Sequence, residues 1–357
     1  MEFEELAGKY SDFYAPNYQI LVDGEDIFSE HLIEITNVSF DDTLEGADRF
    51  SFSINDLEVR WLDSELFEPG KVVEIKMGYV DELATMIVGE IISLGPNFPT
   101  DGTPQLEISG YDLSHQFTRV REHRSFNEMR DSEIVARIAS EARHNLETQI
   151  EQTETVHPHI VQDRQTDYDF IKELADRNFF EFFVKGRTLY FQKPKKDRGE
   201  IVTTLEYGTS LLSFNPELNT ANQVSEVTVR GWNPTTKEQI VGRARRGSEE
   251  ARERGRRSGG EIVENQYGTV EERILDRPVF TQEEADILAR STLNRLSEGL
   301  IRGSAECIGI PEIRAGKTIN LDGLGNKFSR KYYIAGTTHT ISNSGYSTSF
   351  NIKENTL

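Results

Sequence analysis

Two kinds of side chain in this sequence have the type and spacing that could support chemistry. His157 and His159 stand two residues apart, so in a strand both imidazoles would lie on one face and form half of a zinc site. No other His or Cys stands at ligand spacing, which favours a surface turn or edge strand over a metal centre. His339 alternates with threonines, and we expect a packed or hydrogen-bonded sheet residue rather than a general base.

Nucleophilic chemistry finds even less support. Cys307 is the single cysteine and stands in a strand pattern, which indicates a buried, inert thiol. No Gly-x-Ser-x-Gly elbow occurs. With 61 Asp and Glu residues, pairs of carboxylates arise without any catalytic purpose. We therefore predict no enzyme, no cofactor and no metal; a tail-associated cell-wall hydrolase remains the alternative.

The composition narrows the class of protein. The 357 residues suffice for two or three domains, and 36% hydrophobic content suffices for real cores. A net charge of −21 repels nucleic acid and anionic membranes. The acidic start is not a secretory signal, no apolar run is long enough for a membrane span, and one cysteine excludes an intramolecular disulfide. These features indicate a protein made in a reducing cytoplasm.

One segment opposes the overall charge. Residues 243–257 hold seven Arg and three Glu, a net charge of +4. We interpret the segment, about 243–260, as a flexible loop between strands, with partner binding as the low-ranked alternative and nucleic acid as a further one. The arginines of this candidate loop are Arg243, Arg245, Arg246, Arg252, Arg254, Arg256 and Arg257.

The elements that must carry these residues are mostly strands. After a leader at 1–17, residues 18–121 contain about six short alternating segments separated by Gly and Pro turns, typical of a small antiparallel barrel or sandwich. Phe50, Phe52 and Ile54 alternate with serines, the period of a half-buried strand.

After residue 121 the spacing of apolar residues changes from that of strands to that of helices. Residues 122–198 predict a compact α+β insert with a first helix capped by Asp131 or Ser132, a second helix capped by Thr166 with Asp169 at the capping-box position, and an aromatic hairpin turning at Gly186.

Strands return over 199–357, together with a helix at about 281–298. Residues 211–234 echo 32–55 in layout, the Gly-Lys before residue 72 recurs before residue 318, and Gly-Tyr occurs both at 110 and at 345. These echoes predict a duplicated β-domain. The predicted fold class is mainly β: two similar antiparallel barrels flanking a small α+β domain.

Four stretches resemble the late control D family of contractile tail hub proteins: Tyr14–Ile27, Tyr168–Phe191, Val227–Gly242 and Gly309–Ser342. That family includes baseplate hubs of contractile phages and extracellular injection systems and the N-terminal part of VgrG spikes. Family hubs often have Asp where Asn233 stands. The resemblance implies structural roles for Gly231, Trp232, Pro234, Gly316, Gly336 and His339.

The resemblance also implies an assembly. Family members are trimers whose subunits supply two barrels each, so six similar modules meet a hexameric tube while the trimer matches a trimeric spike. We therefore expect a homotrimer that binds a hexameric inner tube or tube-initiator protein, a separate trimeric spike protein and other baseplate proteins. A spike on a separate polypeptide is expected because the chain ends at Leu357 without a short-period repeat. Membrane and nucleic acid are not expected partners. The location would be a phage tail baseplate or a contractile injection particle, between which the sequence does not choose.

Overall fold

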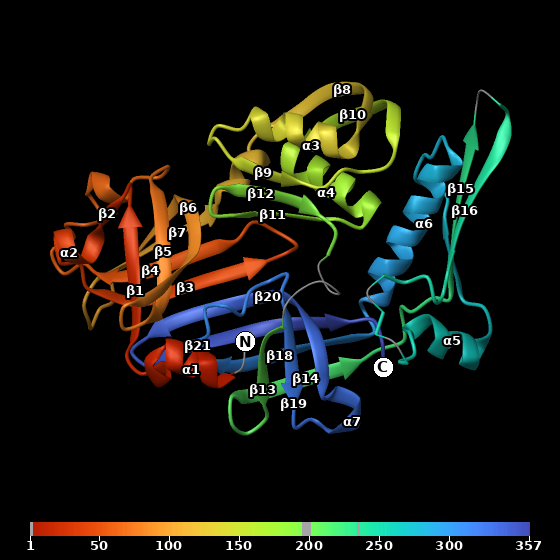
Figure 1. The fold of residues 1–357 in the computed structure, drawn as a ribbon. Coiled ribbons are helices and arrows are strands. Elements are labelled where there is room, and N and C mark those ends of the chain that lie inside the picture. Colours follow the sequence, from red (N-terminus) through yellow and green to blue (C-terminus); the bar gives the residue numbers. More distant parts are fainter. Residues whose placement is uncertain (1–2, 195–200, 234–235, 251, 254) are drawn as a thin grey trace.

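The computed structural model describes residues 3–194, 201–233, 236–250, 252–253 and 255–357. Strands dominate, and an α+β insert lies over the middle of the large sheet (Figure 1). The mainly-β class with an α+β insert is thus confirmed. Among the described helices, none has both the length and the apolar character that a membrane crossing would need.

The first β-module comprises residues 16–112. Its hydrogen-bonded strand order is β3-β4-β7-β6-β5-β1, with the short β2 (Glu25–Asp26) at the outer edge. Phe50, Phe52 and Ile54 all point into the core, as their alternation predicts. The strands are β1 (Pro16–Val22), β3 (Ile35–Thr43), β4 (Arg49–Asn55), β5 (Val72–Tyr79), β6 (Glu82–Asn97) and β7 (Gln105–Asp112). Short helices cover this end: α1 (Phe3–Lys9), η1 (Ser11–Phe13), α2 (Ile27–His31), η2 (Glu65–Phe67) and η3 (Leu113–Thr118).

The second β-module comprises residues 201–218 and 301–354. Its order, β14-β18-β21-β20-β19-β13, repeats the first strand for strand. Only the last pair differs in direction, since β1 and β5 are antiparallel whereas β13 and β19 are parallel. The strands are β13 (Ile201–Glu206), β14 (Leu211–Leu218), β18 (Ile301–Ile308), β19 (Thr318–Asp322), β20 (Arg330–Ser342) and β21 (Gly345–Glu354), with α7 (Gly325–Phe328) before β20. The duplication is therefore visible in the pairing itself.

The Gly-Lys echo marks equivalent backbone positions. Gly70 N donates to Ile91 O and Ile91 N donates to Lys71 O; Gly316, Ile334 and Lys317 repeat both bonds. Gly70 and Gly316 both have positive φ, 95° and 79°, which glycine adopts without strain. One bulge follows each isoleucine, between Ile91 and Ser93 on β6 and between Ile334 and Gly336 on β20. Ile91 and Ile334 are thus structurally equivalent.

Two other echoes are wrong. Gly110-Tyr111 lies near the end of β7, whereas Gly345-Tyr346 begins β21. The segment at 226–233, matched by layout to β4, instead joins a separate sheet of order β16-β15-β17. In the second module β18 fills the place of β4, because an insertion of about eighty residues separates β14 from its partner.

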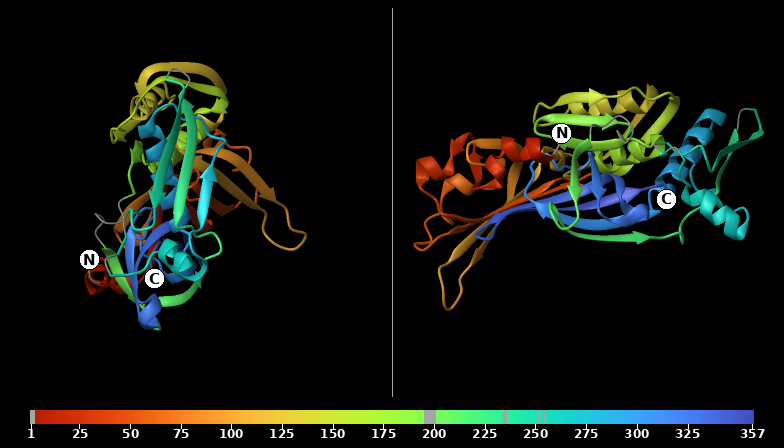
Figure 2. Two further views of the ribbon diagram at one scale, coloured as in Figure 1. Left: turned by 90° about the vertical axis from the view of Figure 1, so that its right-hand side faces the viewer. Right: turned by 60° about the horizontal axis from the view of Figure 1, so that its bottom comes forward.

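That insertion has its own core. Val227 and Val229 of β15 pack with Leu288 and Leu293 of α6. Thr281 accepts from Glu284 N and closes a capping box at the start of α6. The elements are β15 (Glu226–Asn233), β16 (Glu238–Arg245), α5 (Gly259–Tyr267), β17 (Glu271–Ile274) and α6 (Gln282–Ser297). Figure 2 shows this arm at one end of an elongated molecule and the β6–β7 hairpin projecting near the other.

The α+β insert is a second separate core, in which Phe126, Phe170, Phe182 and Phe191 are buried. Thr166 caps α4 by accepting from Asp169 N, as predicted. Its elements are β8 (Arg121–Arg130), α3 (Asp131–Ser140), β9 (Glu147–Ile150), β10 (Val156–Thr166), α4 (Asp167–Asn178), β11 (Glu181–Lys185) and β12 (Thr188–Gln192).

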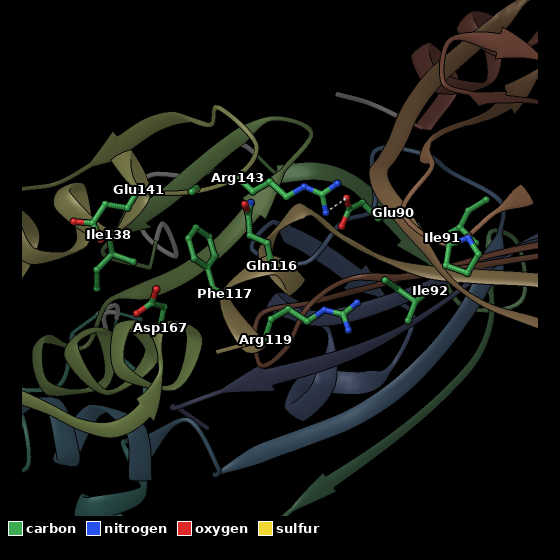
Figure 3. Close-up of a pocket in the computed structure, with 13 residues that line it drawn as sticks. Glu90, Ile91, Ile92, Gln116, Phe117, Arg119, Ile138, Glu141, Arg143 and Asp167 are labelled. Carbon is green, nitrogen blue, oxygen red and sulfur yellow. Dashed lines mark ion pairs between the residues drawn. The ribbon is translucent and has the colours of Figure 1, made fainter. Parts of the chain in front are cut away.

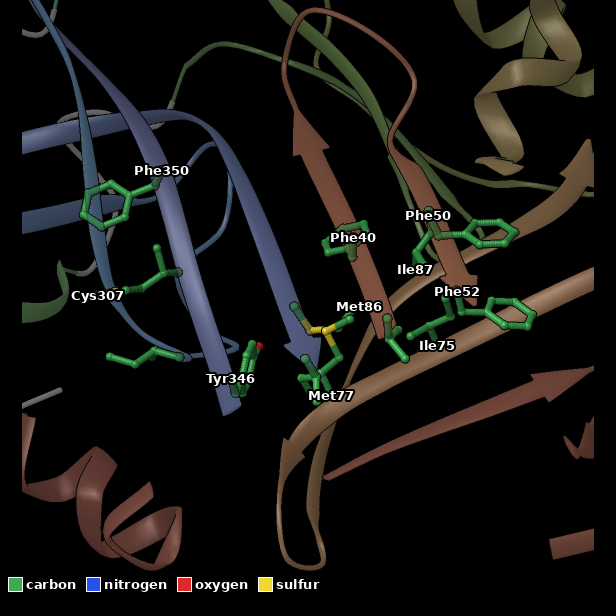
Figure 4. Packing of buried hydrophobic residues seen from close by; sticks show 14 of the residues in the cluster. Phe40, Phe50, Phe52, Ile75, Met77, Met86, Ile87, Cys307, Tyr346 and Phe350 are labelled. Carbon is green, nitrogen blue, oxygen red and sulfur yellow. The ribbon is translucent and has the colours of Figure 1, made fainter. Parts of the chain in front are cut away.

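The largest core runs without interruption through both β-modules. Phe40, Phe50 and Met77 of the first module share it with Cys307 and Phe350 of the second (Figure 4). Burial raises the pKa of the Cys307 thiol, which keeps it protonated and unreactive.

Candidate assembly interface

The two β-modules meet edge to edge. Residues 37–43 of β3 pair antiparallel with residues 336–342 of β20, in register from Thr43 opposite Gly336 to Asn37 opposite Ser342. We call this pairing the internal joint. It merges the modules into one 13-stranded sheet. Among the described strands, the pairing branches at β20, which pairs with β21, β3 and β19, and it does not close either module into its own barrel.

A buried ion pair crosses the internal joint. Arg314, from the loop before β19, places Nε 2.5 Å from Asp42 Oδ2 and donates through Nη2 to Met86 O at 2.9 Å. Its guanidinium also lies 4.7 Å from the centre of the Phe40 ring. Burial opposes ionisation of Asp42, but the charges of Arg314 and Lys185 and the bonds from Arg314 and Ala315 together outweigh it and lower the pKa of this carboxyl. One side chain of the second module is thus bonded to two strands of the first.

Behind this pair lie two further buried carboxyls. Asp48 accepts from Thr43 N at 2.8 Å, and Asp112 accepts from Asp48 N at 2.9 Å. Burial raises the pKa of both groups, that of Asp112 to about 6. They fasten the turn that leads from β3 into β4.

The α+β insert is anchored at the same place. Lys185 Nζ donates to Ala315 O at 3.0 Å, and Tyr333 OH donates to Glu181 at 2.7 Å. Burial lowers the pKa of Lys185. These two bonds anchor the α+β insert to the second module beside the internal joint.

The predicted site residues of the second half divide between two places. Gly336 and His339 lie in the internal joint. Gly316 lies beside it, where Gly316 and Lys317 exchange backbone bonds with Ile334. A Cβ at Gly336 would lie 3.1 Å from Asp42 O, so the close approach of β3 favours glycine. Gly231 and exposed Trp232 lie instead on β15 in the arm, and Pro234 is outside the described residues.

His339 is a structural residue. It is fully buried, and its ring lies 2.9 Å from Ile313 O through Nε2 and 2.9 Å from Tyr346 OH through Nδ1. Burial lowers the pKa of His339 to about 3, so the ring is neutral. A neutral, hydrogen-bonded ring fits the sheet role that the sequence predicts.

His157 and His159 do not cooperate. His157 is buried between Asp131 of the α+β insert, 2.9 Å away, and Glu284 of the arm, 3.1 Å away. Burial alone would lower the pKa of His157, but the two carboxylates raise it to about 9. His159 is exposed and bonds Asn127. His157 alone therefore supplies an ionic link between the α+β insert and the arm, which spacing in the sequence cannot reveal.

The arginines expected in a loop are largely engaged within the chain. Arg243 and Arg245 lie in strand β16 and face Glu226, at 3.9 and 3.3 Å. Arg246 pairs with Glu264, Arg252 with Glu261 and Arg256 with Glu253, while the backbone of Arg257 bonds that of Leu357. Arg254 is outside the described residues.

Besides the outer sides of β1 and β13, each module has another edge that, among the described residues, pairs with no other strand. In the second module it is residues 212–218 of β14; in the first it is the distal part of β6 with the residue after it, 92–98. We call these the free edges. A groove of about 520 Å³ runs from Ile92 to Phe117 and Arg119 beside the β6 edge (Figure 3).

Sequence reasoning missed the residue that does most at the joint, Arg314. A signal was present: the Gly-Lys alignment sets Arg314 opposite Glu68 of the first module, a reversal of charge at one position of a repeat.

Comparison with solved structures places this architecture among phage tail proteins. The 43 kDa tail protein of prophage MuSo2 from Shewanella oneidensis superposes with a TM-score of 0.71 at 13% identity, over 95% of this chain and 98% of that one. The tail protein from Neisseria meningitidis MC58 gives a TM-score of 0.69 at 14% identity, over 96% and 97%. An Escherichia coli component of the type VI secretion system, described as similar to T4 bacteriophage tail proteins gp27 and gp5, gives 0.62 at 11% identity, over 94% and 76%.

At such identities the likeness defines the fold: this is a tail-protein fold. Residues 15–343 match the family described as the Alg8 N-terminal domain, and the chain belongs to that family. No curated protein sequence matches the chain.

Proposed function

We propose that the protein is a non-enzymatic hub of the late control D type, a homotrimer that joins the hexameric inner tube of a contractile tail or injection particle to a separate trimeric spike. The carrying observation is the repeated strand order, with two modules joined edge to edge in one chain. Three chains then offer six similar modules to a sixfold partner and three identical chains to a threefold one.

The likeness to tail proteins supports the setting, and the buried, hydrogen-bonded ring of His339 and the buried thiol of Cys307 support a structural rather than a catalytic role. The proposed partners are the inner tube or its initiator, the spike and neighbouring baseplate proteins. The proposed location is the tail baseplate of a virion or injection particle.

The test is assembly and binding. Light scattering on the purified chain should give the mass of a trimer, and the chain should co-purify with the spike and tube proteins encoded beside its gene. A monomer at micromolar concentration that retains neither partner contradicts the proposal.

A further inference from the structure

The internal joint uses one edge of each module, although each module has both of the edges that such a joint needs. It pairs the β3-type edge of the first module with the distal half of the β6-type strand of the second, which is β20. Each module contains both parts, so β14 and the distal part of β6 are the unused counterparts. We infer that these free edges pair with each other between protomers: β14 of one copy adds antiparallel to residues 94–98 of β6 in the next copy. This inference rests on the proposed trimer and names the surfaces that close it.

The repeat fixes the register. Counting from the equivalent Ile91 and Ile334, Asn97 corresponds to Thr340, which faces Ser39 in the internal joint. Ser39 connects through Ser51 to Ser109, opposite the first residue after the bulge of β6.

The same path leads to Asn215 in the second module. Asn215 connects through Ser304 to Asn351, opposite the first residue after the bulge of β20. Asn215 of one protomer should therefore lie opposite Asn97 of the next.

This register matches the side chains on one face. It sets Phe214 opposite Phe98, Pro216 opposite Pro96 and Leu218 opposite Leu94. Apolar pairs directly opposite each other stabilise antiparallel strands. Phe98 is 60% exposed and Leu218 38% exposed in the single chain.

The counterparts of these six residues in the internal joint are all buried. They form the pairs Val38–Ile341, Phe40–His339 and Asp42–Thr337, and none is more than 5% exposed. Pairing of two protomers would bury the exposed and half-buried residues of the free edges in the same way.

The two prolines define the character of this contact. Asn219 N donates to Leu300 O, so by the alternation of antiparallel bonds Asn215 and Glu217 face β18 and the backbone nitrogen of Pro216 faces outward. No N–H is available there. A proline on an edge blunts it against strands at random.

Pro96 has the same orientation. Asp56 N donates to Pro104 O, so Leu106 directs its backbone toward β4 and Pro96, opposite it, directs its nitrogen away from β7. The prolines therefore meet where neither can donate, and backbone bonds remain for the Leu218–Leu94 and Phe214–Phe98 pairs. Contacts between apolar side chains would therefore select the partner strand more than the backbone hydrogen bonds would.

A cysteine pair tests the register in the full chain. Asn97→Cys combined with Asn215→Cys should form disulfides between copies under mild oxidation and give a covalent trimer on non-reducing gels. Buried Cys307 does not compete. In the shifted control, Gly95→Cys with Asn215→Cys, crosslinking should be about tenfold slower because the two cysteines stand two residue pairs apart along the strands. Equal rates for both combinations would overturn the register.

A second measurement separates this inference from the hub proposal. Leu94→Asp with Leu218→Asp should raise the trimer dissociation constant about tenfold or more, whereas Leu57→Asp, at an exposed leucine away from both edges, should leave it unchanged. A trimer that ignores the double variant and does not crosslink overturns the edge pairing and leaves the hub intact. A monomer that also fails to bind spike and tube removes both.

Discussion

The internal joint and the proposed pairing of the free edges can be compared position by position, because the repeat makes their residues equivalent. The internal joint is continuous over seven residue pairs, from 43–336 to 37–342, and a buried ion pair crosses it. At the free edges Leu218 stands in the place of Asp42, Glu68 in the place of Arg314, and prolines in the places of Phe40 and His339. A contact that never separates can depend on a buried charge pair, because both charges fold together. An edge that must first exist alone in solution is protected by its proline, which removes one outward backbone donor.

The largest effect should come from breaking the ion pair. Arg314→Met leaves Asp42 buried without its guanidinium, and the free energy of unfolding should fall by about 3–5 kcal/mol in urea titrations. Adding Asp42→Leu should recover part of the loss. Glu68→Met, at the exposed equivalent position, should change stability by less than about 0.5 kcal/mol. Equal losses for Arg314→Met and Glu68→Met would contradict the contrast.

The ionic link between the α+β insert and the arm should come next. The pKa of His157 is raised from 6.5 to about 9, so its contribution is full below pH 6.5 and is lost as the pH rises through 9. His157→Gln should therefore cost about 3 kcal/mol near pH 6.5 and almost nothing near pH 10. His159→Gln, exposed on the same strand, is the control. A pH-independent difference would exclude the protonated imidazole as the cause.

A smaller effect should distinguish the two bulges. Gly336→Ala forces Asp42 O to move, and we expect a loss of about 1–2 kcal/mol in thermal or urea unfolding. Ser93→Ala, at the equivalent position on the free edge, should be neutral. A neutral Gly336→Ala would mean that β3 approaches β20 less closely than the joint requires.

The smallest effect is expected on trimer affinity, when the prolines of the two free edges are replaced. Pro96→Ala with Pro216→Ala adds one outward N–H to each free edge, so the trimer should tighten several-fold, since each backbone bond contributes about 1 kcal/mol. Light scattering on dilution measures the dissociation constant of the trimer. Visible aggregation of the variant would also indicate that the prolines prevent these edges from pairing with strands at random. Looser assembly would contradict the register.

Local signals predicted the fold better than long-range ones. The caps at Thr166 and Thr281 and the alternation of Phe50 and Phe52 depend on neighbours in sequence, and all were readable. The Gly-Lys echo was also sound, because a positive φ at a strand start constrains the residue type. The match of 226–233 to β4 failed because that strand alternates well enough for either sheet, and only its partners decide.

The candidate site was less predictable. Gly316, Gly336 and His339 could be singled out, but not the reason for each. Gly336 adjoins a strand more than two hundred residues away, and the ring of His339 bonds Ile313 and Tyr346. Arg314 and Asp42 carry ordinary charged side chains that are abundant in the sequence, and nothing local indicates that folding buries them against each other.

The arm has a consequence for counting. It grows from the hairpin between β14 and β18, whereas the matching hairpin of the first module, between β3 and β4, is the short turn at 44–48. Around a ring of six modules, large and small connections would alternate. A partner that touches only the shared sheet would encounter six equal steps, and one that reaches the arms would encounter three. One insertion in one half of a repeat can thus let a single ring present sixfold symmetry to one partner and threefold symmetry to another.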